Sequence, residues 1–157
     1  MAIRIVRLGT PRTPGEGLRL GTVRRPPRGV PRTEYASRDF YDVWLPELAP
    51  SEDLLKAALG ARDEREWRRF AQRYAAEMKR PPAAHLLDLL AAVSQHSAIS
   101  VGCYCAEETR CHRSILRTLL EDRGARIEQR GAPVDSPPKT PCGGADGGYN
   151  SGERRNP

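Results

Sequence analysis

The side chains best suited to chemistry lie together in residues 103–114. This segment carries thiols, carboxylates, an imidazole and guanidinium groups, in the order Cys-Tyr-Cys-Ala-Glu-Glu-Thr-Arg-Cys-His-Arg-Ser. Thiols act as nucleophiles or redox groups, Glu and His transfer protons, and Arg binds anions. Their concentration predicts an anion-binding pocket over the loop of residues 105–113, with thiol-dependent catalysis as its chemistry.

Two thiols of this loop are candidate nucleophiles or redox groups. Cys105 follows a predicted strand, and Cys111 lies in the expected first turn of a helix. The helix dipole lowers the pKa of a thiol in that position and favours the reactive thiolate. Glu107 and His112 lie in the same turn between the strand and the helix, and they are the candidate proton-transfer groups. Cys103 is on the apolar face of the strand, and we expect it to pack in the core.

Arginine supplies the predicted anion-binding side of the pocket. Arg113 closes the thiol loop, and Arg25, Arg28 and Gly29 lie in a second loop rich in Arg and Pro, residues 24–31. A guanidinium group binds phosphate or carboxylate through two parallel hydrogen bonds. The expected ligand therefore bears a phosphate or a carboxylate, while the sequence names no cofactor, substrate or oligomeric state.

A structural metal site is an alternative use of the same side chains. Cys103, Cys105, Cys111 and His112 are all possible zinc ligands. The usual zinc spacing, with two residues between paired cysteines, does not occur in the chain. The sequence therefore keeps a metal-binding protein as an alternative function but assigns no residue to a metal.

A nucleic-acid-binding module is the second alternative. The chain has 26 Lys and Arg against 20 Asp and Glu, a formal net charge of +6. Eight Arg and only two Glu lie in residues 1–34, so this segment holds the whole excess. Clustered Arg is the footprint of phosphate binding, but the interleaved aromatic residues that stack bases are missing from the predicted strands.

Alternating strands and helices must position these groups. Apolar alternation predicts strands at residues 3–8 and 18–22, an extended segment at 40–45, a buried strand at 98–105 and a closing strand at 125–127. Helical periodicity and capping signals predict helices at residues 51–59, 67–78, 84–95 and 111–123. The first two strands are joined by a short link rich in Pro and Gly, which predicts a hairpin.

This order predicts an α/β protein. We expect a compact three-layer fold, with a mixed, mostly parallel sheet and helices on both faces. Residues 1–130 form the single predicted domain, and residues 131–157, rich in Gly and Pro, form a predicted disordered tail.

The N-terminal residues do not resemble a secretion signal. Arg4 and Arg7 interrupt the apolar run that a signal peptide would need, and the longest stretch without charged residues, 89–106, is too polar to span a bilayer. We therefore expect a cytoplasmic protein with no membrane partner.

Four segments, taken in order, resemble the cysteine-containing branch of the family called domain of unknown function 488. They are RPPRG at residues 25–29, WLPELAPS at 44–51, the helix with Trp67, Phe70 and Tyr74, and the loop with CAE at 105–107 and CHRS at 111–114. The resemblance covers roughly residues 3–127 and excludes the tail. It implies a compact three-layer α/β fold, without a settled reaction.

Overall fold

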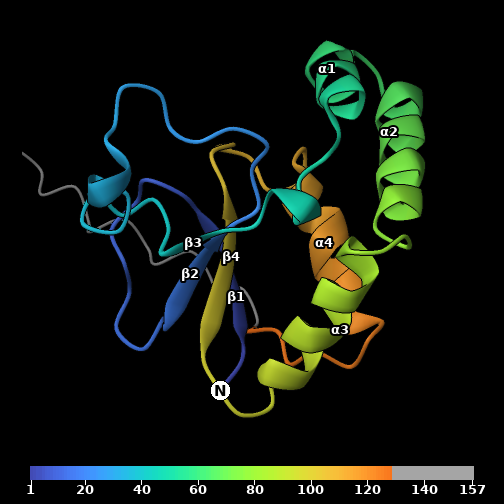
Figure 1. Cartoon of the computed structure of the whole chain (residues 1–157). Coiled ribbons are helices and arrows are strands. Elements are labelled where there is room, and N and C mark those ends of the chain that lie inside the picture. The colour runs from blue at the N-terminus through green and yellow to red at the C-terminus, as the bar shows by residue number, and fades with distance from the viewer. Residues whose placement is uncertain (129–157) are drawn as a thin grey trace, which may run out of the picture.

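The computed structural model describes residues 1–128, which form one sheet with helices packed beside it (Figure 1). The strands are β1 (Ile3–Arg7), β2 (Leu18–Gly21), β3 (Val43–Trp44) and β4 (Ile99–Cys103). The helices are α1 (Glu52–Gly60), α2 (Glu64–Glu77), α3 (Ala83–Val93) and α4 (His112–Glu121), with the 3-10 helices η1 (Arg32–Glu34) and η2 (Pro46–Leu48). The predicted domain boundary at residue 130 and the predicted tail, 131–157, lie outside the described residues.

The sheet has the order β1-β4-β2-β3, and every neighbouring pair is parallel. Val101 in the middle of β4 pairs with Ile5 of β1 and with Leu20 of β2. All five residues of β4 are buried, as expected for the central strand of a parallel sheet. The predicted closing strand is a single parallel bridge between Ile127 and Ile3.

The predicted hairpin between the first two strands is wrong, because β4 lies between them. The link of residues 8–17 is too short for a helix, but an extended chain covers about 3.3 Å per residue and can return along the sheet. Buried polar groups hold it there. Arg19 donates to the Glu16 carboxylate at 2.5 Å and to the Thr10 carbonyl at 2.9 Å. Ser100 of β4 donates to the same carboxylate at 2.9 Å.

The four α-helices lie on one side of the sheet (Figure 1). Their main core joins Leu20 and Val101 of the sheet to Leu87 of α3 and Leu116 of α4. Ser51 caps α1 by accepting a backbone N–H group, as predicted. Asp63 caps α2 in the same way, so this helix begins at Glu64 and not at the predicted residue 67. No helix in the described part of the chain is long and apolar enough to cross a membrane.

The opposite face is covered mainly by irregular chain. The Tyr41 ring fills the space over Gly21, where an added Cβ would lie 2.4 Å from the Tyr41 Cδ1 atom. Leu8, Val23 and Tyr41 form a second apolar cluster with Cys103 and Cys111. Among the helices of the described residues, only the 3-10 helix η1 lies on this side (Figure 1). The α/β class is therefore confirmed, with α-helices on one face and one short 3-10 helix on the other.

Candidate functional site

The thiol segment connects the carboxyl end of β4 to the N-terminus of α4. Cys103 is the last residue of β4, and Cys111 is the N-cap of α4, with an extended backbone (φ −129°, ψ 148°). The Cys111 N–H donates to the Glu108 carbonyl at 3.0 Å, which closes the loop just before the helix. Ligands of parallel sheets bind at this edge, as the sequence predicts for this segment.

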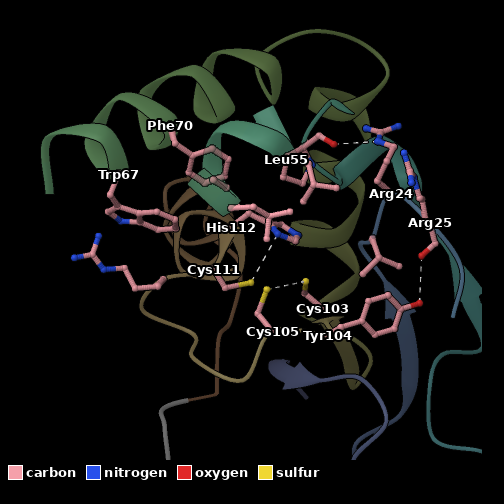
Figure 2. Close-up of a pocket in the computed structure, with 15 residues that line it drawn as sticks. Arg24, Arg25, Leu55, Trp67, Phe70, Cys103, Tyr104, Cys105, Cys111 and His112 are labelled. Carbon is pink, nitrogen blue, oxygen red and sulfur yellow. Dashed lines mark hydrogen bonds between the residues drawn. The ribbon is translucent and has the colours of Figure 1, made fainter. Parts of the chain in front are cut away.

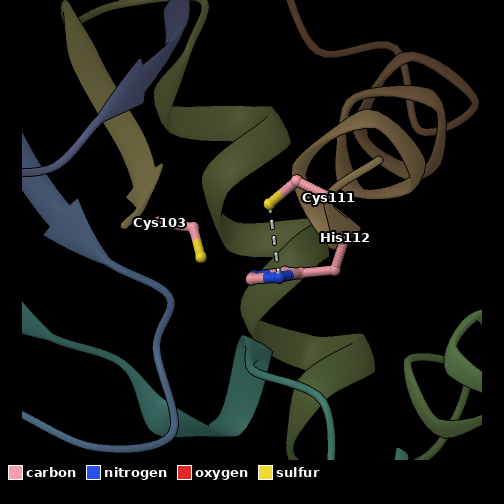
Figure 3. A group of neighbouring side chains, drawn as sticks. All are labelled: Cys103, Cys111 and His112. Carbon is pink, nitrogen blue, oxygen red and sulfur yellow. Dashed lines mark hydrogen bonds between the residues drawn. The ribbon is translucent and has the colours of Figure 1, made fainter. Parts of the chain in front are cut away.

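Three thiols and one imidazole meet at this junction (Figures 2 and 3). The Sγ atoms of Cys103 and Cys105 are 3.7 Å apart, and Cys111 Sγ is 3.7 Å from His112 Nδ1. Cys103, Cys111 and His112 are buried, and their ligand atoms all lie within 4.8 Å of one another. All three cysteines are free thiols, and Cys105 is the exposed one.

The orientation and tautomer of His112 are set by β2 and its continuation. His112 Nε2 lies 2.8 Å from the carbonyl oxygen of Thr22, which can only accept a hydrogen bond. Nε2 therefore carries a proton, and in the neutral ring Nδ1 is the unprotonated nitrogen that faces Cys111. The Thr22 hydroxyl donates to the Gly102 carbonyl at 2.9 Å, which ties this support to β4. The Tyr74 ring packs edge-on against the imidazole, with centroids 5.5 Å apart.

Arg113 places a positive charge beside the thiols. Its side chain is buried, with 2% of the residue exposed. The guanidinium donates to the carbonyls of Val6 and Cys105, both at 2.6 Å, and its Nε donates to Cys111 Sγ at 3.4 Å. Within the described residues, no carboxylate forms an ion pair with Arg113. A buried cation without a counterion is costly, so the neighbouring sulfur atoms are the natural place for a negative charge.

The pKa values of Cys105 and Cys111 are lowered, as expected for thiols beside the positive charge of Arg113. Hydrogen bonds from Cys103 and Cys111, with the charge of Arg113, lower the pKa of Cys105 to about 3. Hydrogen bonds from Cys103 and then His112 also lower the pKa of Cys111. Donating to the other two sulfurs raises the pKa of Cys103. These shifts favour a thiolate at Cys105, the exposed member of the cluster.

The thiols open into a cavity of about 220 Å³ (Figure 2). Leu55 of α1 and the rings of Trp67 and Phe70 of α2 face the sulfur atoms across this space, and Arg24 and Arg25 lie at its other end. The cavity thus has apolar walls, a thiol and imidazole floor, and cationic side chains at its margin.

The sequence matches the family model described as "Active DUF488-N3 subclade" over residues 3–124, which is more than half of the chain. The chain belongs to the DUF488 family. The predicted family is therefore confirmed. No curated protein and no solved structure gave a significant match.

Most of the predicted catalytic residues of this DUF488 protein are brought together. Cys105, Cys111 and His112 all line the cavity. Glu107 is exposed and is not one of the lining residues. Arg113 is buried and is not one of the lining residues, and three of its five N–H groups donate to Cys111 Sγ and to the carbonyls of Val6 and Cys105.

The predicted second loop reaches the site only in part. Arg25 lines the thiol cavity, while its exposed guanidinium pairs with Glu52 at 2.8 Å. Arg28 lines a neighbouring hollow with Arg25 and Tyr104. Gly29 has a positive φ of 70° and forms the turn that ends this motif.

Sequence reasoning missed the aromatic wall of the cavity. Trp67 and Phe70 have the helical spacing of core residues, and Phe70 is indeed buried in the main core. Trp67 is only half-buried, and the Arg110 guanidinium lies 5.7 Å from its ring centroid. The wall depends on the packing of α2 beside the thiol loop, which no local pattern in the sequence reveals.

The Arg-rich N-terminal segment is largely paired within the fold. Five of its arginines have partners. Four pair with carboxylates, and Arg24 donates to two backbone carbonyls: Arg4 with Glu128, Arg12 with Asp42, Arg19 with Glu16, Arg25 with Glu52, and Arg24 with Ala49 and Pro50. Three of the acidic partners lie outside residues 1–34, so the positive excess counted along the sequence is partly offset in space. This pairing gives the nucleic-acid alternative no support.

Proposed function

We propose that this DUF488 protein is a thiol-dependent enzyme in which the Cys105 thiolate attacks an electrophilic centre of a small substrate. The observation that carries the proposal is the buried guanidinium of Arg113, which contacts Cys111 Sγ and the Cys105 carbonyl and has no carboxylate partner in the described chain. That charge favours a thiolate in the cluster, and Cys105 is its exposed member. The matched subclade is described as active, which supports an enzymatic role.

The neighbouring groups suit the roles that such a reaction needs. The Cys105 sulfur would form a bond to the electrophilic atom while the leaving group departs with the electrons of the broken bond. The Cys111 thiol can supply the proton that the leaving group takes up. The unprotonated Nδ1 of His112 faces Cys111, so it can accept a proton from the water that attacks the intermediate and return that proton to Cys111. Hydrolysis of the thiol-linked intermediate by water would release the product and restore the thiolate.

The cavity indicates the kind of substrate. Trp67 and Phe70 offer aromatic surface to an apolar or planar group, and Arg24 and Arg25 lie where a phosphate or carboxylate could bind. To bind the anion, Arg25 would have to leave its ion pair with Glu52. That pair is exposed and contributes little to stability. A small molecule with a planar body and an anionic group therefore fits best.

Alkylation of the metal-free protein with iodoacetamide tests the proposal. Rates are measured for each cysteine by peptide mass spectrometry between pH 4 and pH 9. A thiol with a pKa near 8.5 reacts about tenfold faster per pH unit below that value, whereas Cys105 should react at a nearly constant rate. The shape of the profile is diagnostic, because a thiolate of low pKa is also a weaker nucleophile and its absolute rate is unremarkable. An ordinary profile at Cys105 would refute the proposal.

A further inference from the structure

We propose that Cys103, Cys111 and His112 form a binding site for a thiophilic divalent metal ion, Zn²⁺ first among them, with Cys105 as an exchangeable fourth ligand. The three residues are buried and offer two sulfur atoms and one nitrogen within 4.8 Å of one another. Two thiolates and an imidazole form one of the ligand sets found in zinc sites that keep an open position. This inference does not depend on the proposed function.

Two of the distances among the four side chains match those of a tetrahedral metal site. With Zn–S bonds of about 2.3 Å, two sulfur ligands of a tetrahedral ion lie about 3.8 Å apart, and a sulfur and a nitrogen slightly closer. The Cys103–Cys105 pair and the Cys111–His112 pair are each separated by 3.7 Å. They would form two opposite edges of a tetrahedron, and the ligand atoms of Cys103, Cys111 and His112, all within 4.8 Å of one another, would move closer together around the ion. The ion would replace the thiol protons, which pass to solvent.

The surroundings of His112 are those of a metal ligand. Its Nε2–H donates to the Thr22 carbonyl at 2.8 Å, which leaves the lone pair of Nδ1 directed toward the thiols. Metal-bound histidines almost always have such a partner on the other ring nitrogen, because it fixes the tautomer and the ring orientation. The hydrogen bond that orients His112 for metal binding is therefore already present in the fold.

The charge balance of the site explains why Cys105 would be the fourth ligand. A divalent ion with the thiolates of Cys103 and Cys111 is neutral, which leaves the buried charge of Arg113 without compensation. An anion in the fourth position restores neutrality. The exposed Cys105 thiolate, 3.7 Å from Cys103, can provide it, and so can an anionic ligand that enters from the cavity.

Metal titration of the reduced, chelator-treated full chain tests this site. Co²⁺ should bind with a stoichiometry of one and give the absorption bands of a tetrahedral thiolate complex, and Zn²⁺ should displace it. Cys111→Ser and His112→Gln should each weaken binding by about tenfold or more. Cys105→Ser should retain a site with altered bands, and Cys142→Ser, at the thiol outside the described residues, should match the wild type.

Two results would overturn the metal site. One is the absence of a tetrahedral Co²⁺ spectrum in the folded wild type. The other is an unchanged Zn²⁺ affinity in Cys111→Ser and in His112→Gln, with circular dichroism confirming that each variant is folded. The Cys105→Ser variant separates the two proposals, because it removes the proposed nucleophile and keeps the three buried ligands. The pH profile of Cys105 alkylation in the wild type therefore tests the nucleophile, and metal binding by Cys105→Ser tests the three buried ligands. Either proposal can fail while the other stands.

Discussion

Replacing Arg113 should raise the pKa of the reactive thiol at Cys105. Hydrogen bonds from Cys103 and Cys111 are the larger causes of its low pKa, and the charge of Arg113, whose Nε lies 3.4 Å from Cys111 Sγ, adds to them. A unit charge at about 4 Å from a thiolate lowers its pKa by at most about 3 units at an effective dielectric constant near 20. Cys105 is open to the cavity, so solvent screening reduces the effect, and we expect about 2 units for Arg113→Met. The pKa of Cys105, about 3 in the wild type, should therefore rise to about 5.

The midpoint of the pH profile of Cys105 alkylation measures this change in metal-free protein. Arg113→Lys keeps the charge but loses the fork of hydrogen bonds to Val6 and Cys105, so its midpoint should shift by less than about 1 unit. Arg117→Met is the matched control, because Arg117 lies one turn further along α4 and pairs with Glu108. Equal midpoints for Arg113→Met and Arg117→Met would refute the electrostatic argument, whatever their effect on stability.

Two further predictions concern the fold. Burial raises the pKa of Glu16, but hydrogen bonds from Arg19, from a backbone N–H and from a serine hydroxyl outweigh it and lower the pKa from 4.5 to about 2. Its contribution to stability is thus complete above pH 4.5 and lost between pH 4.5 and 2, and Glu16→Gln should lose about 3 kcal/mol at pH 7 in urea unfolding, a loss that shrinks toward pH 2. Gly21→Ala should cost about 1–3 kcal/mol, because its Cβ would lie 2.4 Å from the Tyr41 ring; an unchanged urea midpoint would contradict this packing.

The helices and the central strand were predictable because their signals are local. The apolar stripe that contains Phe70 and Tyr74, the capping residue Ser51, and the apolar run of β4 each depend on residues close in sequence. The sheet order was not predictable in this way. Placing β4 between β1 and β2 depends on a buried polar link whose partners, Glu16 and Ser100, are far apart in sequence.

The same division applies to the candidate site. Three of the four predicted catalytic residues line one cavity because a strand-to-helix turn brings neighbours in sequence together. The support for His112 comes from Thr22, and the aromatic wall comes from α2, both distant in the chain. Arg113 was predicted as part of the site, but only the burial of its side chain reveals that it faces sulfur atoms rather than an external anion.

The buried charge of Arg113 links the two proposals for this site. Without a metal, one thiolate among the three thiols balances the guanidinium, and the net charge of the cluster is zero. With a divalent ion and three thiolates, the net charge is again zero. Loading the site therefore exchanges two protons for one divalent ion, and the net charge of the buried cluster does not change. An exposed arginine would not impose this balance, because solvent screens its charge. The fixed, buried guanidinium is consequently the feature that makes one cluster suited both to hold a reactive thiolate and to bind a thiophilic metal.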